Sequence, residues 1–217
     1  YRKYRPLHFD EVLGQDHVVE VLKAAVKSGD ITHSYLFFGS RGTGKTSVAR
    51  ILAREIGSAP EDIYEIDAAS NRGIDDIREL REGVRVLPFK SPYKTYIIDE
   101  VHMLSKDAFN AFLKTLEEPP RHAVFVLATT EMHKVPETII SRCQTFTFKK
   151  PTHALLKKSA LHIAQKEGYA LDVGAADLIA VLGDGSSRDM QGVLHLIFGA
   201  AQNKTIERDF VEKITSA

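Results

Sequence analysis

The residues with the clearest chemical potential stand between Gly39 and Thr46, where the sequence reads GSRGTGKT. Glycines let such a loop curl until consecutive backbone N–H groups face one anion, and a lysine adds a side-chain ammonium. This spacing predicts a loop for nucleotide phosphates, in which Lys45 reaches the β- and γ-phosphates and Thr46 holds Mg²⁺. A glycine-rich turn that only caps a helix is the alternative, but an apolar run precedes the loop and a helical pattern follows it. The predicted nucleotide contacts are Gly42, Thr43, Gly44, Lys45, Thr46 and Ser47.

Two adjacent acids, Asp99 and Glu100, end a second apolar run. Asp99 is expected to hold Mg²⁺ through its water shell, and Glu100, on the other side of the strand end, to polarise the water that attacks the γ-phosphate. Two acids at a strand end also occur in ordinary solvated turns. The phosphate loop in the same chain favours the catalytic interpretation, which predicts an ATPase.

Short β-rich runs alternate with helical patterns up to about residue 148 and supply the frame for these residues. The predicted strands are 33–38, 63–66, 94–99, 123–129 and 144–148. Several are apolar throughout, as in a parallel sheet that helices cover on both faces. Amphipathic periodicity predicts two of those helices, at 18–26 and 109–116. We therefore predict a nucleotide-binding α/β domain over residues 1–149.

The β-like runs disappear after Pro151, and only helical patterns remain. They predict helices at roughly 152–166, 172–182, 187–202 and 206–214, separated by glycines and Asn203. Residues 150–217 are therefore predicted to form a small all-helical domain, and the boundary is too short to be a flexible linker.

The composition is that of an ordinary globular chain of 217 residues, 43% of them apolar. Its 29 basic and 29 acidic side chains cancel, which excludes a broad field for binding polyanions. No apolar run approaches a membrane span, and the single cysteine, Cys143, rules out an internal disulfide. We expect a cytoplasmic protein and, because the chain opens without methionine, a trimmed fragment.

Several short motifs follow one another in an order that covers nearly the whole chain. They are KYRP at 3–6, VLGQ at 12–15, DEVHMLS at 99–105, TLEEPP at 115–120, LATTE at 127–131 and SRC at 141–143. Together with the phosphate loop, this series resembles the AAA+ clamp-loader subunits, and more narrowly the gamma/tau family of bacterial DNA polymerase III. The resemblance implies a P-loop NTPase with a five-stranded parallel sheet flanked by helices, followed by a helical lid domain. ATP or ADP and Mg²⁺ are the implied cofactors.

The resemblance also implies roles for residues outside the phosphate loop. An N-terminal stretch would lie against the adenine base, and its residues are Tyr4, Arg5, Pro6, Val12 and Leu13. A plain hydrophobic anchor is the alternative for this stretch. Thr130, with Thr129 as the second choice, would be a first sensor between the γ-phosphate and the acidic strand, although a satisfied buried hydroxyl is the ordinary explanation.

Two arginines complete the implied site. Arg142 matches an arginine finger that acts in trans on the ATP of a neighbouring subunit, since a guanidinium stays charged and suits a transferring phosphoryl group. Arg188 matches a second sensor, through which the lid touches the nucleotide of its own chain. The ordinary alternatives are a surface ion pair for Arg142 and a helix-start pair with Asp189 for Arg188.

The implied function is that of an ATP-hydrolysing motor subunit of the DNA polymerase III clamp loader, which loads the sliding clamp on primed DNA during replication. Its implied partners are the other subunits of a hetero-pentamer, the sliding clamp and primer-template DNA, with no membrane. A polymerase site is not expected in this chain. The alternatives are a scaffold subunit with little ATPase of its own, or another AAA+ DNA-processing machine such as a branch-migration helicase or a replication initiator.

Some features of the family are missing. A four-cysteine zinc module usually follows the helix after the phosphate loop, but only residues 57–62 fill this interval, so zinc is not expected. Without the family's collar domain, the fragment is expected to be monomeric and a poor ATPase. Asn71, Arg72 and Lys106 are candidates for DNA contact by position, although each is more often a solvated loop residue.

Overall fold

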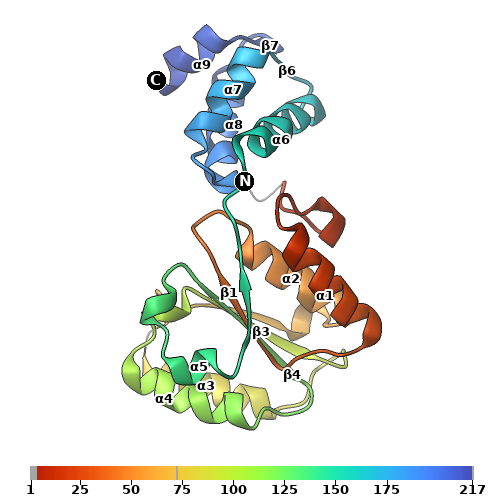
Figure 1. Cartoon of the computed structure of the whole chain (residues 1–217), viewed down its shortest axis with the longest axis vertical. Coiled ribbons are helices and arrows are strands. Elements are labelled where there is room, and N and C mark those ends of the chain that lie inside the picture. The colour runs from red at the N-terminus through yellow and green to blue at the C-terminus, as the bar shows by residue number, and fades with distance from the viewer. Residues whose placement is uncertain (1–3, 72, 217) are drawn as a thin grey trace.

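A parallel sheet forms the centre of the larger part of the molecule in the computed structural model, which describes residues 4–71 and 73–216 (Figure 1). Its five strands are β1 (Ser34–Phe38), β2 (Ile63–Asp67), β3 (Lys94–Asp99), β4 (Ala123–Thr129) and β5 (Gln144–Thr147). They lie in the order β2-β3-β4-β1-β5 and are all parallel. The predicted strands are confirmed, each within one residue at either end.

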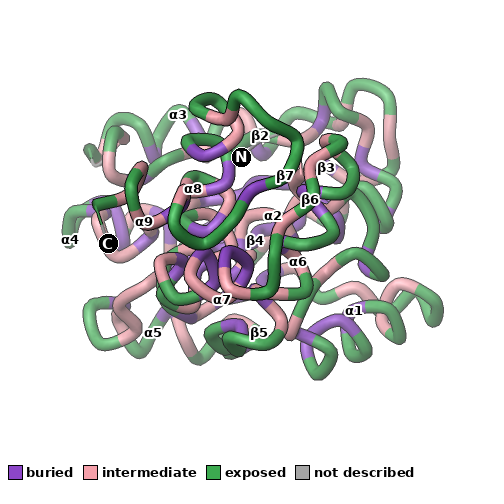
Figure 2. The backbone as a smooth tube through the Cα atoms, turned by 90° about the horizontal axis from the view of Figure 1, so that it is seen from above, coloured by how far each residue is buried: buried purple, intermediate pink, exposed green. Residues whose placement is uncertain are grey.

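Helices cover both faces of this sheet, because neighbouring side chains of a strand point to opposite sides. The helices are α1 (Asp16–Ser28), α2 (Lys45–Glu55), α3 (Ile74–Arg85), α4 (Lys106–Glu117) and α5 (Glu137–Ile140), with 3-10 turns η1 (Phe9–Glu11), η2 (Pro60–Asp62), η3 (Val101–Met103) and η4 (Met132–Lys134). On one face, α1 and α2 pack against Ile97 and Val126. On the other, α3, α4 and α5 pack against Ile98 and Leu127. The buried residues therefore gather between the helices and the strands (Figure 2).

Helices α3 and α5 are not among those that the sequence predicts. In α3 the buried residues Ile77, Leu80 and Val84 form one narrow stripe among charged neighbours. Packing of that stripe against α4 stabilises the helix, and such packing is a tertiary contribution that periodicity alone does not reveal. No helix in the described ranges is long and apolar enough to cross a membrane.

Beyond β5 the chain forms a bundle that we call the lid. Its helices are α6 (His153–Lys166), α7 (Val173–Leu182), α8 (Ser187–Ala200) and α9 (Arg208–Thr215). They share a core of their own, which includes Leu156, Ile179 and Leu194, and the bundle stands apart from the sheet (Figure 1). The side chains of Thr152 and Asp172 cap α6 and α7, which explains why the predicted starts of both helices lie within one residue of the observed ones. A domain boundary at residues 149 and 150 stays a prediction.

The lid is not wholly helical. Ala170–Leu171 (β6) and Thr205–Ile206 (β7) pair as short parallel strands, and Ala170 N–H donates to the Lys204 carbonyl at 2.8 Å. The expectation of an all-helical tail misses this pairing, because strands of two residues leave no periodicity to detect.

A buried carboxylate, Asp62, organises the segment that leads into β3. Its oxygens accept from the N–H groups of Phe89 (2.6 Å), Lys90 (2.8 Å) and Ser91 (3.1 Å), and from the Ser91 hydroxyl (2.7 Å). Burial alone would raise the pKa of Asp62, but these hydrogen bonds favour the charged form and lower the pKa to about 2. Asp62 therefore stabilises the fold as a charged group.

We expect Asp62→Asn to lower the free energy of unfolding by about 2 kcal/mol at pH 7, because buried donors lose a charged acceptor. The folded pKa lies below the unfolded value, so the contribution is fully present above about pH 5 and disappears as the pH falls toward 2. Urea unfolding at pH 7, 4 and 3 measures this, with exposed Asp30→Asn as the matched control. A difference between Asp62→Asn and the unmodified chain that does not shrink with falling pH would contradict the assignment.

Candidate nucleotide site

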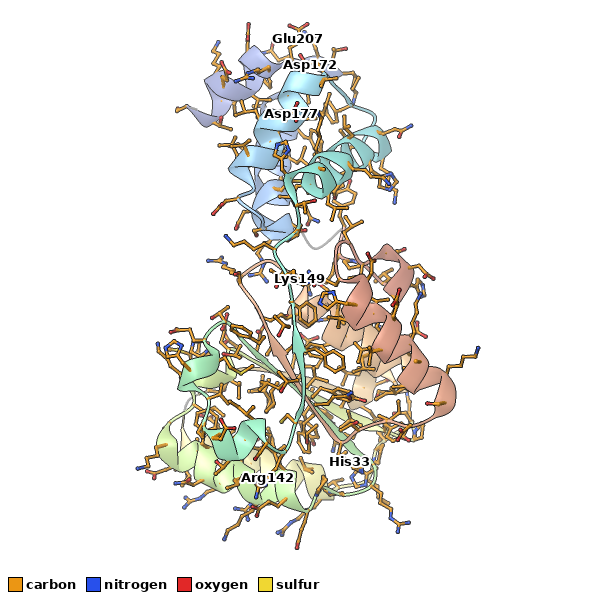
Figure 3. The ribbon with its side chains drawn as sticks, viewed as in Figure 1. His33, Arg142, Lys149, Asp172, Asp177 and Glu207 are labelled. Atoms are coloured by element: carbon orange, nitrogen blue, oxygen red, sulfur yellow. The ribbon has the colours of Figure 1, made fainter. Side chains whose placement is uncertain are left out.

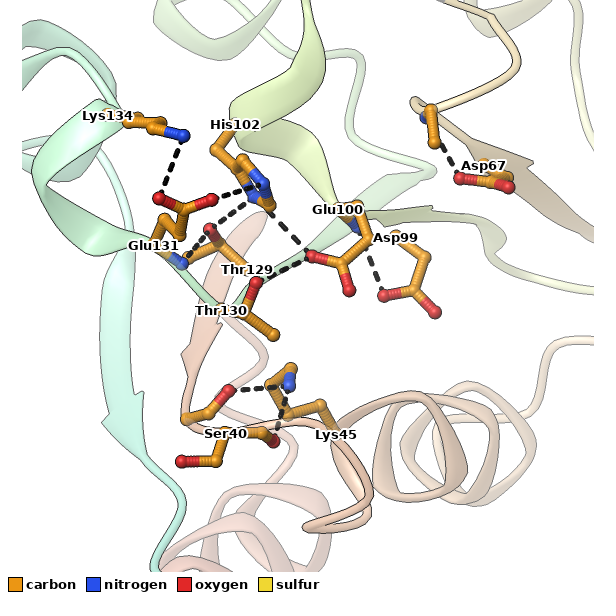
Figure 4. Close-up of polar contacts among 12 residues, drawn as sticks. Ser40, Lys45, Asp67, Asp99, Glu100, His102, Thr129, Thr130, Glu131 and Lys134 are labelled. Atoms are coloured by element: carbon orange, nitrogen blue, oxygen red, sulfur yellow. Dashed lines mark hydrogen bonds and ion pairs between the residues drawn. The ribbon is translucent and has the colours of Figure 1, made fainter. Parts of the chain in front are cut away.

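The phosphate loop joins β1 to α2 and is curled at two glycines. Gly42 and Gly44 have φ angles of 76° and 100°, in the region that disfavours residues with a Cβ. Lys45 opens α2, and its Nζ turns back to donate to the carbonyls of Gly39 (2.7 Å) and Ser40 (3.0 Å) (Figure 4). The ammonium therefore lies against the carbonyls of the loop, and Thr46 is the next residue in the first turn of α2.

Burial and nearby charges act on Lys45 in opposite directions. The residue is 6% exposed, and loss of solvation lowers the pKa of its ammonium. The carboxylates of Glu100 and Asp99 oppose this lowering, while the positive Arg188 adds to it. The charges of both acids and of the lid arginine thus all act on the ammonium of Lys45. The structure therefore brings these four predicted residues into one electrostatic environment at the phosphate loop.

Thr46 and Asp99 meet at the carboxyl end of β3. Thr46 Oγ1 donates to Asp99 Oδ2 at 2.7 Å, so the hydroxyl and the carboxylate predicted to hold Mg²⁺ are adjacent. Hydroxyl, carboxylate and water oxygens are the ligands that Mg²⁺ prefers, and this donor set fits that ion. Within residues 4–71 and 73–216, no cluster of three His, Cys, Asp or Glu side chains is arranged to hold a metal.

Glu100 follows Asp99 with its backbone in the left-handed region, at a φ of 50°. Thr130 Oγ1, just beyond β4, donates to Glu100 Oε2 at 3.1 Å (Figure 4). The Thr129 hydroxyl instead meets His102 Nδ1 at 3.0 Å and accepts from Glu131 N–H at 3.0 Å. Of the two threonines considered for the first sensor, Thr130 is therefore the one beside the predicted general base.

The lid touches the phosphate loop through the start of α8. Ser187 N–H donates to the Gly42 carbonyl at 3.2 Å, and a Cβ added to Gly42 would lie 1.9 Å from Ser186 Oγ. Glycine at position 42 thus permits a close approach that a larger residue would prevent. Arg188 follows in the first turn of α8, where its charge reaches Lys45. The residue predicted as second sensor lies at the site of its own chain.

Gln15 is a site residue that the sequence does not single out. It is 0% exposed, and its amide binds the backbone of two distant segments. Nε2 donates to the carbonyls of Lys149 (2.7 Å) and Thr43 (3.3 Å), and Oε1 accepts from Lys149 N–H (3.0 Å). Lys149 lies where the chain leaves the sheet for the lid (Figure 3). Gln15 therefore ties the phosphate loop to the segment that carries the lid, and its place in VLGQ is the only sequence signal for it.

The N-terminal stretch predicted to contact adenine runs between the two parts of the molecule. Tyr4 packs against the core of the lid, whereas Val12 packs against the core that α1 and α2 form on the sheet. Arg5 and Pro6 are half-buried, and Leu13 is 42% exposed. This placement suits a base-binding stretch and equally suits an anchor for the N-terminus.

Arg142 is not brought to the site of its own chain. Its Nη2 pairs with Glu117 Oε1 at 2.7 Å and its Nη1 donates to the Thr138 carbonyl at 2.7 Å. It lies toward the end of the molecule away from the lid, whereas Lys149 lies between the sheet and the lid (Figure 3). A role in trans is compatible with this position, and the contacts of Arg142 within the chain include the surface ion pair with Glu117.

Of the three candidates for DNA contact, the structure describes Asn71 and Lys106. Asn71 Nδ2 donates to the Asp67 carbonyl at 3.0 Å, and Lys106 is exposed at the start of α4. Arg72 lies outside the described residues.

The chain has extensive similarity to bacterial replication proteins. A model of the family described as DNA polymerase III, delta subunit, matches residues 57–152. The chain is 46% identical to the DNA polymerase III subunit tau of Bacillus subtilis (strain 168), over 89% of this chain and 38% of that protein. It is 41% identical to the gamma subunit of Buchnera aphidicola subsp. Baizongia pistaciae, over 87% of this chain and 56% of that protein. The chain thus spans little more than half of these relatives at most.

The fold of the chain is also similar to that of a solved structure. The RuvB Holliday junction branch migration motor of Thermotoga maritima matches with a TM-score of 0.81, covering 98% of this chain and 72% of that chain. The identity is 23%, so this match shows a shared fold alone. It confirms the AAA+ type of fold that the sequence motifs imply.

We expect Gln15→Leu to lower the free energy of unfolding by about 2 kcal/mol, because backbone groups of Thr43 and Lys149 lose their buried partners. The stabilisation that MgATP gives the chain should also shrink, since the loop loses one of its supports. Urea unfolding with and without MgATP measures both effects. Exposed Gln165→Leu is the matched control and should change stability by less than about 0.5 kcal/mol. Equal stability of the two variants would show that the Gln15 contacts carry little energy.

Proposed function

Since the chain belongs, over the region that aligns, to the AAA+ clamp-loader subunits of the DNA polymerase III gamma/tau type, we propose that it binds and hydrolyses ATP. The observation that carries this proposal is the array at the carboxyl ends of three neighbouring strands, β3, β4 and β1. The loop after β1 presents Lys45, β3 ends in Asp99 and Glu100, and β4 is followed by Thr130. Ligands of parallel α/β sheets bind at this edge.

Each residue of the array has one proposed task. Backbone N–H groups of the loop and the Lys45 ammonium bind the phosphates, with Ser47 at the start of α2 as a further contact. Thr46 and Asp99 hold Mg²⁺, which when bound neutralises charge on the phosphates. Glu100, oriented by Thr130, accepts a proton from the attacking water.

In this proposal, nucleotide binding changes the angle between the lid and the sheet domain. In this proposal ATP lies between the phosphate loop and Arg188, with its base against the stretch from Tyr4 to Leu13. The two parts, divided near residues 149 and 150, then take an angle that depends on the bound nucleotide. The contacts of Ser187 and Gln15 with the loop support this coupling.

Hydrolysis is proposed to be a property of an assembly. Arg142 lies away from its own site, which supports a role as the finger that completes the site of a neighbouring subunit. The proposed assembly is the hetero-pentameric clamp loader of the bacterial cytoplasm, acting on the sliding clamp and primed DNA. The net charge of zero supports DNA binding by the assembly rather than by the single chain.

The fold is also compatible with two other functions, that of a scaffold with a vestigial site and that of a branch-migration motor. A scaffold with a vestigial site would not need the hydrogen bond between Thr46 and Asp99, or the charges of Asp99 and Glu100 acting on Lys45, so the intact array disfavours it. A branch-migration motor shares the fold, but at 23% identity against 41–46% for the gamma and tau subunits. The clamp-loader proposal is therefore the better supported.

A surface loop offers a protein partner an apolar contact. Val86, Leu87 and Phe89 are 61%, 73% and 78% exposed, and Asp62 holds the end of this loop through the N–H of Phe89. Exposed apolar side chains on an anchored loop are typical of protein interfaces and unsuited to a DNA backbone. Exposure therefore favours a protein over DNA as the partner of this loop, and of the protein partners we propose the sliding clamp.

Arg142→Ala in the assembled complex should leave ATP binding nearly unchanged and reduce turnover at the interface at least 100-fold, because only the transition-state charge loses a partner. Lys45→Ala should abolish binding itself. Calorimetry with MgATP and steady-state phosphate release distinguish these outcomes, with exposed Arg121→Ala as the matched control. Parallel loss of binding and turnover in Arg142→Ala would reject the finger assignment, and no binding by the unmodified chain would favour the scaffold.

Leu87→Ser combined with Phe89→Ser should weaken binding of the assembled complex to the sliding clamp at least tenfold, because two large side chains lose their burial. Thermal stability should stay unchanged, since both side chains are exposed. Val181→Ser with Val173→Ser, exposed on α7, is the matched control. Unchanged clamp affinity with impaired subunit assembly would assign the loop to another subunit instead.

A further inference from the structure

A histidine with a buried side chain lies behind the proposed general base and has no part in the function described so far. The side chain of His102, in η3, is 5% exposed, and its ring lies between two carboxylates (Figure 4). Nδ1 lies 3.4 Å from Glu100 Oε2, and Nε2 lies 3.3 Å from Glu131 Oε1. The imidazole therefore links the acid at the end of β3 to an acid beyond β4.

Glu131, the acid beyond β4, is itself held in place by other residues. Glu131 Oε2 pairs with Lys134 Nζ at 2.8 Å, and that contact is the main reason why the pKa of Glu131 is lowered. Glu131 N–H also donates to the Thr129 hydroxyl, which lies 3.0 Å from His102 Nδ1. The Thr129 hydroxyl thus holds the Nδ1 side of the His102 ring, and the charged carboxylate of Glu131 faces its Nε2 side.

We propose that His102 is a positioning residue: it orients the carboxylate of Glu100 so that this carboxylate can accept a proton from the attacking water. This inference rests on the proposed ATPase function. Thr130 Oγ1 donates to Oε2 of Glu100 at 3.1 Å. His102 Nδ1, which hydrogen-bonds the Thr129 hydroxyl, lies 3.4 Å from the same oxygen, so both groups act on one oxygen of the carboxylate. Oε1 is then the oxygen assigned to the attacking water. A general base is effective only when its orientation is fixed relative to the proton it accepts.

The left-handed backbone of Glu100 makes this support necessary. A φ of 50° is an uncommon conformation for a residue with a Cβ and persists only where the surroundings hold it. Met103 N–H donates to the Glu100 carbonyl at 2.8 Å, which fixes the backbone, while Thr130 and His102 fix the side chain. The η3 turn therefore serves to place the ring of His102 against the acid that precedes it.

The test compares His102→Phe and His102→Gln with the unmodified protein in the assembled complex. Phenylalanine keeps a ring in the buried site but offers no hydrogen bond, so kcat should fall about tenfold while the Kd for MgATP changes less than about twofold. Glutamine keeps an amide donor and should retain more of kcat than phenylalanine. His133→Phe is the matched control, because His133 is 75% exposed and lies 3.7 Å from the same Glu131. Its kcat should stay within about twofold of the unmodified value.

The outcomes separate this inference from the proposed function. If Glu100→Gln loses turnover but His102→Phe keeps it within about twofold, the positioning role is wrong and the ATPase proposal stands. If the unmodified complex has no turnover, or Glu100→Gln keeps it, the proposed function fails and this inference with it. Loss of ATP binding in step with kcat would assign His102 a structural role only. Where His102→Phe fails to fold by circular dichroism, kcat and Kd of His102→Gln decide by the same criteria.

Discussion

The phosphate loop places one constraint on the rest of the molecule: if its N–H groups are to face an anion, its carbonyls need donors from elsewhere. Lys45, Gln15 and Ser187 supply these donors. They belong to three different parts of the chain, namely the helix after the loop, the N-terminal segment and the lid. The shape of the loop therefore depends on all three segments packing together, and a substitution that disturbs any one of them is expected to alter the loop.

The same contacts make the loop and the lid one hydrogen-bonded unit. Gln15 joins Thr43 in the loop to Lys149 at the root of the lid, and Ser187 joins the lid helix α8 to Gly42. A ligand that changes the loop must preserve or break these bonds, each worth about 1 kcal/mol. Only such a difference in contacts lets a ligand shift a conformational equilibrium. Under the proposed function, these hydrogen bonds would link nucleotide state to lid position.

Local signals in the sequence predict much of this architecture. The central strands, such as β3 and β4, are buried over most of their length, and the loop motif stands in its required context, so both follow from neighbouring residues. The missed features depend on contacts between distant segments. Helix α3 is stabilised by α4, β6 exists only through β7, and Gln15 and His102 gain their roles from partners that the fold supplies. No periodicity or spacing along the chain encodes such partners.

Residue types and spacing alone predict the chemical groups of the site: the ammonium of Lys45 and the hydroxyl of Thr46 after a glycine-rich loop, and the acids Asp99 and Glu100 at the end of an apolar run. The tertiary structure decided which groups meet. It placed Thr130 rather than Thr129 beside Glu100 and left Arg142 away from the site of its own chain. The reason is that residue types are local properties, whereas contacts depend on the order of strands in the sheet, which brings the ends of β3, β4 and β1 together.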